Sequence, residues 1–206
     1  MLISAALVSG CGKPATRVPV QLETTEVQFY RGERLGSILD FRENSIRGPQ
    51  QVDRDRYRLR VNGLVDVPLA YTYDQVLDFP NYSKVVTLHC VEGWSVKILW
   101  EGVLLGDILL AAGMKTGANT VIFHGHDGYS TSLPLDYVLA RDILLAYKMN
   151  GVVLPPERGF PFQVVAESKL GYKWAKWVTE IEVSNDADYR GFWESRGYDN
   201  DADLRR

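Results

Sequence analysis

The chain is organised around residues Thr87–Leu105, which read TLHCVEGWSVKILWEGVLL. This run predicts a strand, a turn and a second strand. Alternation along the first strand places Cys90 on one face with Val86 and Leu88. The only other cysteine is Cys11, near the N-terminus. A single thiol on a predicted strand, without a disulfide partner, requires either a chemical or a packing explanation.

Length and composition limit the class of protein. The 206 residues and 23.2 kDa suit one domain with a full hydrophobic core. A hydrophobic fraction of 46% and a charged fraction of 24% are typical of a soluble globular protein. The net charge of -3 provides no basic field, so we expect no nucleic acid partner.

The N-terminus is expected to be a segment apart from the folded domain. Residues 1–28 read as a signal and a polar tether, and the domain is placed at residues 29–206. A short apolar stretch ends in Val8-Ser9-Gly10-Cys11, which resembles the bacterial lipobox, in which the cysteine is lipidated. The stretch is too short to span a bilayer. This reading predicts an exported lipoprotein, periplasmic or at the cell surface, that touches the membrane only through Cys11. The alternative is a frayed N-terminus that is not a signal.

Short elements are expected along the rest of the chain. Asn62-Gly63 is a strong hairpin signal after the alternating stretch Tyr57–Val61. Thr72 and Gln75 have capping-box spacing before a short helix that Pro80 ends. The other expected elements are strands at 83–91 and 94–100, a helix at 104–113, a strand at 119–124, one or two helical turns at 135–140, strands at 143–149 and 160–166, and a last long strand at 173–183.

Many short strands with a few short helices indicate the α+β class, with a β-rich mixed or rolled sheet. A regular doubly wound sheet is not expected, because helices do not alternate with strands and no Gly-rich phosphate loop follows the first strand. The tail from Gly191 onward is expected to pack over the surface through Phe192, Trp193 and Tyr198.

Three explanations remain open for Cys90 at this point. It can be a buried cysteine that packs as a small hydrophobic residue. It can be a nucleophile with His89, His124 or His126 as its base, although His89 is adjacent in the strand and faces the other way. It can also be a metal ligand. One thiolate with dispersed histidines does not have the spacing of a zinc site, but it suffices when a cofactor brings the remaining ligands.

Four motifs, in matching order along most of the chain, resemble the sulfite oxidase family of molybdenum–pterin oxidoreductases. These motifs are His89–Ser95 (HCVEGWS), Trp100–Val103 (WEGV), Asp127–Tyr129 (DGY) and Gly171–Trp177 (GYKWAKW). The resemblance implies the fold of that family and a molybdopterin-binding oxidoreductase domain at 29–206. It implies molybdenum with molybdopterin as cofactor and Cys90 as the metal ligand, since in the family a cysteine joins the pterin sulfurs on the metal. A thiolate is a soft anionic donor that coordination keeps deprotonated.

The resemblance also assigns cofactor-binding roles by position. A buried pterin phosphate requires paired donors. The matching positions are Asn44, Arg47, Arg158, Lys173, Trp174 and Lys176. For the two lysines, the alternative is solvent exposure on alternate strand positions. Tyr129 is expected to place its hydroxyl in the substrate site, with simple packing as the alternative.

The residues after the cysteine bear on the substrate. The run CVEGWS resembles the periplasmic methionine sulfoxide reductase branch more than the animal or plant sulfite oxidases, which have asparagine and arginines there to bind sulfite. This chain has Trp94–Val96 instead, although Arg42, Arg47 or Lys169 can substitute from elsewhere in the chain. It departs from the reductase branch as well, because Gln163 stands where that branch has an arginine.

The resemblance implies oxygen-atom transfer on a small sulfur- or nitrogen-oxide substrate. The chain has no C-x-x-C-H haem motif and too few cysteines for an iron–sulfur cluster. Electrons must therefore be exchanged with a separate partner, such as a cytochrome or a membrane quinone-linked protein. The alternatives are a non-catalytic exported binding module that keeps the fold without the cofactor, and a thiol hydrolase built on Cys90.

Overall fold

The structure, a computed structural model, describes residues 25–204. The expected signal and the lipobox cysteine Cys11 therefore lie outside the described residues. Within the described part, no helix is long and apolar enough to cross a membrane.

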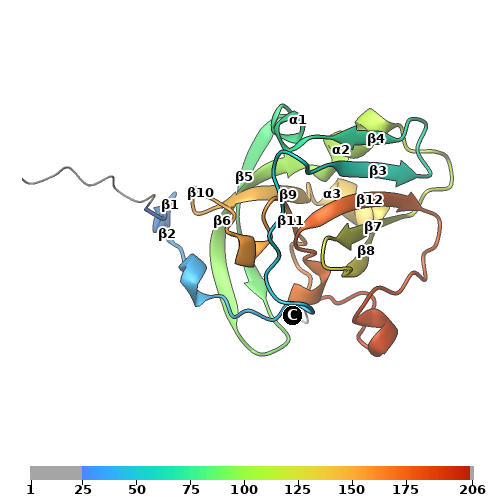
Figure 1. Cartoon of the computed structure of the whole chain (residues 1–206). Coiled ribbons are helices and arrows are strands. Elements are labelled where there is room, and N and C mark those ends of the chain that lie inside the picture. Colours follow the sequence, from blue (N-terminus) through green and yellow to red (C-terminus); the bar gives the residue numbers. More distant parts are fainter. Residues whose placement is uncertain (1–24, 205–206) are drawn as a thin grey trace, which may run out of the picture.

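The first of two five-stranded sheets holds the strand that ends next to Cys90 (Figure 1). Its strand order is β10-β9-β6-β5, and β11 pairs with β9 from outside this path. All of its pairings are antiparallel. The strands are β5 (Asn81–His89), β6 (Ser95–Leu104), β9 (Leu144–Met149), β10 (Val152–Val153) and β11 (Gln163–Val165).

The second five-stranded sheet has the order β4-β3-β12-β7-β8. Its strands are β3 (Leu59–Gly63), β4 (Leu69–Tyr71), β7 (Thr120–Gly125), β8 (Ser130–Pro134) and β12 (Val178–Ser184). Strand β12 runs parallel to β3, whereas the other pairs are antiparallel, so the sheet is mixed. The prediction of a β-rich α+β fold with a mixed or rolled sheet is confirmed.

The helices are short and lie between strands. They are α1 (Tyr73–Leu77), α2 (Leu105–Ala112) and α3 (Leu135–Ala140), with 3-10 turns η1 (Ile38–Asp40), η2 (Pro156–Arg158), η3 (Gly171–Lys173) and η4 (Glu194–Arg196). A small hairpin, β1 (Phe29–Tyr30) and β2 (Glu33–Arg34), precedes them. The predicted capping box begins α1: Thr72 Oγ1 accepts the Gln75 N–H at 3.2 Å, and the Gln75 side chain accepts the Thr72 N–H at 2.8 Å.

One hydrophobic core joins both sheets. It includes Ile98 and Trp100 of β6 as well as Phe123 of β7 and Ile181 of β12, all fully buried. Alternation on β5 matches the prediction, because Val86, Leu88 and Cys90 are buried while Thr87 and His89 are only partly buried. The Cys90 thiol therefore lies on the face of β5 that packs against the core.

The predicted hairpin at Asn62-Gly63 was wrong. Strand β3 continues through Gly63, and its antiparallel partner is Leu69–Tyr71, so the connection is longer than a two-residue turn. A Cβ on Gly63 would lie 2.1 Å from the carbonyl oxygen of Val183 on the parallel strand β12. This glycine therefore permits close packing of β3 against β12. In the sequence alone, such a glycine after an asparagine cannot be distinguished from one in a hairpin turn.

The predicted strand from Lys173 was also wrong in its first half, since β12 begins only at Val178. The segment before it forms η3 and an irregular connection. The indole N–H groups of its two tryptophans donate hydrogen bonds to backbone carbonyls there. Trp174 Nε1 donates to Lys169 O at 3.0 Å, and Trp177 Nε1 donates to Pro156 O at 2.7 Å. The alternating aromatic and basic residues of this segment therefore belong to a buried connection and not to a strand.

Candidate active site

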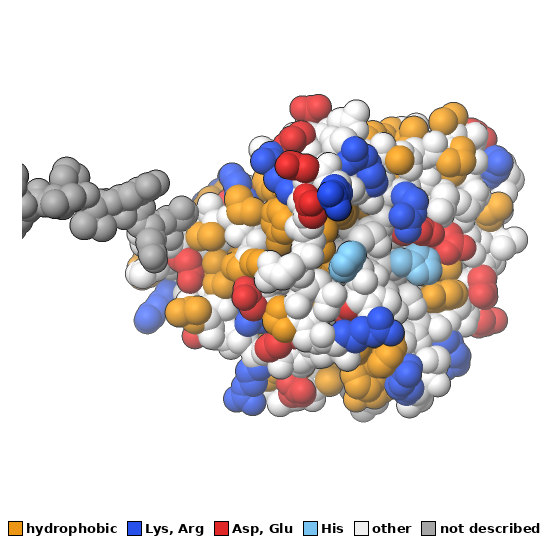
Figure 2. Space-filling view, in the orientation of Figure 1, with side chains coloured by type: hydrophobic (Ala, Val, Ile, Leu, Met, Phe, Trp, Pro, Cys, Tyr) orange, Lys and Arg blue, Asp and Glu red, His pale blue; other side chains and the backbone are white. Residues whose placement is uncertain are grey.

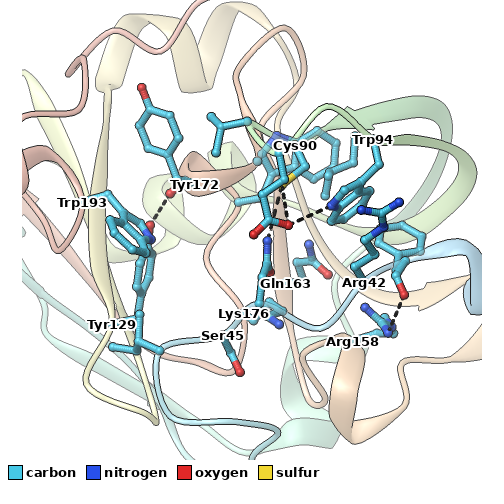
Figure 3. Close-up of a pocket in the computed structure, with 18 of the residues that line it drawn as sticks. Arg42, Ser45, Cys90, Trp94, Tyr129, Arg158, Gln163, Tyr172, Lys176 and Trp193 are labelled. Carbon is cyan, nitrogen blue, oxygen red and sulfur yellow. Dashed lines mark hydrogen bonds between the residues drawn. The ribbon is translucent and has the colours of Figure 1, made fainter.

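Cys90 lies in a cavity that opens to solvent (Figure 3). Segments far apart in the sequence meet there: the arm before β3, the turn between β5 and β6, the proline loop, η3 and the C-terminal segment. The lining residues are Phe41, Arg42, Asn44, Ser45, Ile46, Leu88, Cys90, Val91, Glu92, Trp94, Asp127, Tyr129, Arg158, Gln163, Gly171, Tyr172, Trp174, Lys176, Trp177, Trp193 and Tyr198.

A tight turn after β5 holds the cysteine. The Cys90 N–H donates to Trp94 O at 2.9 Å, and the Gly93 N–H donates back to Cys90 O at 3.1 Å. Gly93 has φ +84°, a value that favours glycine. Asn44 Nδ2 donates to Cys90 Sγ at 3.4 Å, and Glu92 Oε2 lies 3.9 Å from the sulfur while accepting the Trp94 indole N–H at 3.0 Å. Figure 3 shows dashed lines that end at the Cys90 sulfur, whereas the line from Trp94 ends at the neighbouring carboxylate.

The surroundings of Cys90 oppose a free thiolate. The residue is only 8% exposed, and burial raises the pKa of its thiol above the ordinary value, with the Glu92 carboxylate acting in the same direction. None of the three histidines lines the cavity, and His124 instead contacts Glu182 at 3.0 Å. The arrangement therefore lacks both requirements of a cysteine nucleophile, a lowered pKa and a nearby base.

Two cations lie at one end of the cavity. The Lys176 side chain is 17% exposed and its Nζ lies 3.5 Å from Glu43 Oε2. Arg158, half-buried, donates to Phe41 O at 3.2 Å and lies over the Phe41 ring. Burial lowers the pKa of both side chains, and Glu43 partly opposes this for each. Burial removes the interactions of these two cations with water. An anion bound at this end of the cavity would compensate for that loss.

The cavity does not include every predicted cofactor residue. It brings together Asn44, Cys90, Arg158, Trp174 and Lys176. Arg47 is not among the lining residues; its guanidinium lies beside Gly128, close enough to influence Asp127.

Lys173 was assigned to the cofactor, but its ammonium group faces away from the cavity. Its side chain is 1% exposed and pairs with Glu194, 0% exposed, at 2.7 Å, with further bonds to Ser132 O and Asn200 Oδ1. Its backbone N–H is also occupied, donating to Leu170 O at 2.9 Å. The side chain therefore holds the C-terminal segment and does not contact the site, and surface exposure, the alternative for both lysines, is wrong as well.

Aromatic residues form the other end of the cavity. Figure 3 shows Tyr129, Tyr172 and Trp193 together, apart from Cys90, Lys176 and Arg158. The Tyr129 hydroxyl donates to the carbonyl oxygen of Tyr172. Burial raises the pKa of Tyr129 well above its ordinary value, so the hydroxyl stays protonated at neutral pH and presents only its oxygen lone pairs to a ligand.

Sequence reasoning missed Glu92, Trp193 and Tyr198 as site residues. A carboxylate two positions after a candidate metal ligand was the available signal for Glu92. The two aromatic residues were predicted only to pack over the surface, which they do: Trp193 contacts Tyr198 with ring centroids 5.1 Å apart. No local pattern indicates that this packing also closes a cavity.

The sequence matches the family described as "Oxidoreductase molybdopterin binding domain" over residues 46–193. The chain belongs to this family. The matched region contains both five-stranded sheets and most of the residues around the cavity.

Relatives place the chain in the sulfite oxidase family of molybdopterin oxidoreductases. An "Uncharacterized oxidoreductase YuiH" of Bacillus subtilis is 42% identical over 73% of this chain and 76% of its own length. A "Putative protein-methionine-sulfoxide reductase subunit YedZ1" of Azospira oryzae is 35% identical over 72% and 56% respectively. Human mitochondrial sulfite oxidase is 32% identical over 77% of this chain and 34% of its own. The chain thus spans only part of several relatives.

A solved structure supports the same placement. The sulfane dehydrogenase SoxCD of Paracoccus pantotrophus aligns with a TM-score of 0.64 and 26% identity, covering 67% of this chain and 40% of that one. The protein is therefore an enzyme of a molybdopterin-dependent oxidoreductase family with the fold predicted from the sequence.

The residues of the cavity fit a molybdenum–pterin cofactor. A soft sulfur donor, Cys90, stands within it. The partly buried cations Lys176 and Arg158 suit the phosphate of the pterin, and Trp94 and Trp174 offer apolar surfaces for a planar ring system. The thiol that the protein alone keeps protonated is deprotonated by coordination to a metal.

Proposed function

We propose that the protein transfers an oxygen atom to or from a small sulfur- or nitrogen-oxide, using molybdenum bound to molybdopterin. The observation that carries this proposal is the position of Cys90, a buried thiol without a base, between a cationic end and an aromatic end of one cavity. A non-catalytic module has no need for such a thiol, and family membership favours the enzyme.

The chain's own residues have separate tasks in this proposal. Cys90 serves as the metal ligand, and Asn44 donates a hydrogen bond that steadies its sulfur. Lys176 and Arg158 hold the phosphate. When bound, the molybdenum centre supplies two-electron oxygen-atom transfer chemistry. The aromatic walls surround the site with apolar surface, which strengthens the electrostatic interactions inside the cavity.

Charge in the cavity favours a neutral substrate over sulfite. Once Lys176 and Arg158 hold the phosphate, the remaining cation among the lining residues is Arg42, which is exposed. Two carboxylates, Glu92 and Asp127, also line the cavity. Lys169, another candidate for an anion clamp, instead pairs with Asp203 at 2.6 Å. A dianion would therefore meet more repulsion than attraction, which supports a sulfoxide or an N-oxide.

The test uses Cys90→Ser, which replaces a soft sulfur with a hard and weakly acidic oxygen. We expect the wild-type protein, made in a host with an intact cofactor pathway, to contain molybdenum and to turn over methionine sulfoxide or another neutral oxide with a dye as electron donor. The variant is expected to lose at least about 100-fold in activity, comparable to the loss of other metal-site interactions. Wild-type protein free of molybdenum, or full metal and activity in Cys90→Ser, would sink the proposal and favour the non-catalytic alternative.

Electrons are proposed to come from a separate redox protein, a cytochrome or a membrane quinone-linked protein. A relative is named as one subunit of a reductase, which supports a division of labour between proteins. Reduction of the isolated protein by dye, but not by NADH alone, is the expected result. Direct reduction by NADH would contradict this part of the proposal.

Export and lipid anchoring at Cys11 are proposed from the lipobox-like tetrad. Metabolic labelling with radioactive palmitate in a bacterial host, comparing wild type with Cys11→Ala, tests this proposal. Label in the wild type that the substitution removes is expected, and equal label in both contradicts an anchor at this cysteine.

A further inference from the structure

A second group of metal-ligating side chains lies on the sheet that contains β7 and β12. His124 of β7 and Glu180 and Glu182 of β12 each offer one ligand atom, and these three atoms lie within 4.8 Å of one another. His124 Nε2 is 3.0 Å from Glu182 Oε2. None of the three residues is among those that line the Cys90 cavity. The cluster is therefore separate from the proposed cofactor site.

The register of the two strands brings these side chains to one face of the sheet. Figure 1 shows β7 beside β12, and the two pair in antiparallel directions, with His124 opposite Glu180 and Ile122 opposite Glu182. Residues directly opposite in a sheet share a face, as do residues two positions apart on one strand. The three side chains thus extend from backbone positions that the sheet holds in place, as a preorganised site requires.

The type and spacing of the donors match a zinc ion. Imidazole nitrogen and carboxylate oxygen bind zinc at about 2.0–2.2 Å, and tetrahedral bonds of that length separate ligand atoms by about 3.3–3.6 Å. The cluster brackets this range, from 3.0 Å between His124 and Glu182 up to the 4.8 Å limit. A histidine also favours zinc over magnesium or calcium, which prefer oxygen ligands. The three side chains are between 20% and 37% exposed, so an ion can reach them from solvent.

The charges in the cluster also favour a cation. Two carboxylates at this separation repel each other. Arg60 compensates Glu180, because it donates to Oε2 at 2.6 and 2.9 Å, and Asn62 donates to Oε1 at 3.1 Å. Within residues 25–204, Glu182 pairs with no lysine or arginine. The Arg60 side chain is 56% exposed, so it can turn into solvent when an ion takes its place.

We propose that His124, Glu180 and Glu182 bind one zinc ion, which joins β7 to β12 as a structural site and leaves a fourth position for water. This inference goes beyond the proposed function and does not depend on the molybdenum centre. Both strands lead to the Cys90 cavity, since Asp127 lies two residues after β7 and Trp177 lies immediately before β12. The ion therefore fixes the strand pair from which these two lining residues extend.

Calorimetric titration of the metal-free, full-length protein with zinc chloride tests the site. We expect one zinc ion per chain. His124→Ala and Glu182→Gln should each weaken binding at least about tenfold, since loss of a ligand costs no less than loss of a supporting contact. Glu182→Gln keeps the size of the side chain and serves if His124→Ala does not fold. His126→Ala is the matched control: this exposed histidine lies outside the cluster, and its removal should leave zinc binding unchanged.

Two further measurements locate the ion. Zinc-edge X-ray absorption should show nitrogen and oxygen ligands at about 2.0–2.2 Å and no sulfur at about 2.3 Å, which separates this site from the cysteines. Zinc should raise the unfolding temperature of the wild type and of His126→Ala but not that of His124→Ala, because an ion that binds only the folded chain stabilises it. Arg60→Met removes a competing cation and should tighten binding at least about threefold.

The inference is overturned if the wild type binds no stoichiometric zinc, if His124→Ala and Glu182→Gln bind it as tightly as the wild type, or if sulfur coordinates the ion. The molybdenum content of the same preparations bears only on the proposed function, so the two proposals fail separately.

Discussion

At the scale of single residues, the environment of Cys90 determines which chemistry is open to it. Burial and the Glu92 carboxylate both favour the protonated thiol. A nucleophilic cysteine requires the opposite, a pKa lowered by a base or a cation. Coordination to a metal ion removes the proton regardless of this bias. The thiol of Cys90 is therefore protonated and unreactive in the protein alone, and it becomes a strong thiolate donor when it coordinates a metal.

Lys176 provides a prediction at the same scale. Its buried ammonium group is expected to hold the pterin phosphate, so Lys176→Met should lower the molybdopterin content of the purified protein by roughly tenfold, within the range for lost supporting contacts in metal sites. Pterin fluorescence after oxidative release and molybdenum per chain measure the content.

A matched control for Lys176 exists on the surface. Lys97 also pairs with a glutamate, Glu33, at 2.9 Å, but its side chain is 45% exposed and lies outside the cavity. Lys97→Met should keep full cofactor content. If the two variants retained equal cofactor, Lys176 would have no role in holding the phosphate.

At the scale of elements, a buried ion pair connects η3 to the C-terminal segment. Lys173 and Glu194 are fully buried, Glu194 Oε1 also accepts from Thr131 Oγ1 at 2.5 Å, and Glu194 Oε2 has no hydrogen-bond partner in residues 25–204. Removing one partner of such a pair leaves an unpaired buried charge. Lys173→Met should therefore destabilise the fold by roughly 3–5 kcal/mol.

The double variant Lys173→Met with Glu194→Leu is expected to be more stable than Lys173→Met alone, because no charge remains buried. Urea unfolding of wild type and both variants gives the free energies. A double variant as unstable as, or less stable than, the single one would show that the pair contributes through packing and not through charge.

Elements with local signals were predicted from the sequence, and elements that depend on distant partners were not. The alternation of β5 and the capping box at Thr72 reside within a few residues, so both were confirmed. The segment at Lys173 was assigned to a strand because the residue that satisfies its charge, Glu194, is 21 positions away. Gly63 was assigned to a turn because its close neighbour, Val183, belongs to a strand much later in the chain.

At the scale of the whole molecule, the site draws on segments from Phe41 to Tyr198. The order of the family motifs along the chain was enough to predict the fold and the molybdopterin-binding family, and it named Arg158 and Lys176, which the cavity brings together. The aromatic end depends on how the C-terminal segment crosses Ser130, which no motif records. The face shown in Figure 2 has acidic and basic side chains interspersed.

Buried tyrosines spread over the molecule predict how stability depends on pH. Burial raises the pKa of Tyr57 and Tyr129 well above the ordinary value, and that of Tyr172 to about 12. The unfolded chain releases these protons near pH 10, whereas the folded chain retains them. Their contribution to stability is therefore complete below about pH 10 and is lost as pH rises toward and through the folded values.

The expected result is a free energy of unfolding that falls above pH 10, by up to about 1.4 kcal/mol per pH unit for each such tyrosine. Urea unfolding between pH 8 and pH 11, with absorbance at 295 nm to follow tyrosinate, measures it. Tyr57 donates to Val178 O at 2.5 Å, so Tyr57→Phe should lower stability at pH 8 but make the decline above pH 10 shallower. The slope of the free energy of unfolding against pH reports the ionisation of Tyr57, whereas its value at pH 8 also includes the lost hydrogen bond. Equal slopes in both proteins, or a folded state in which all tyrosines ionise near pH 10, would contradict the burial of these hydroxyls and with it the packing of the arm and η3 against the sheets.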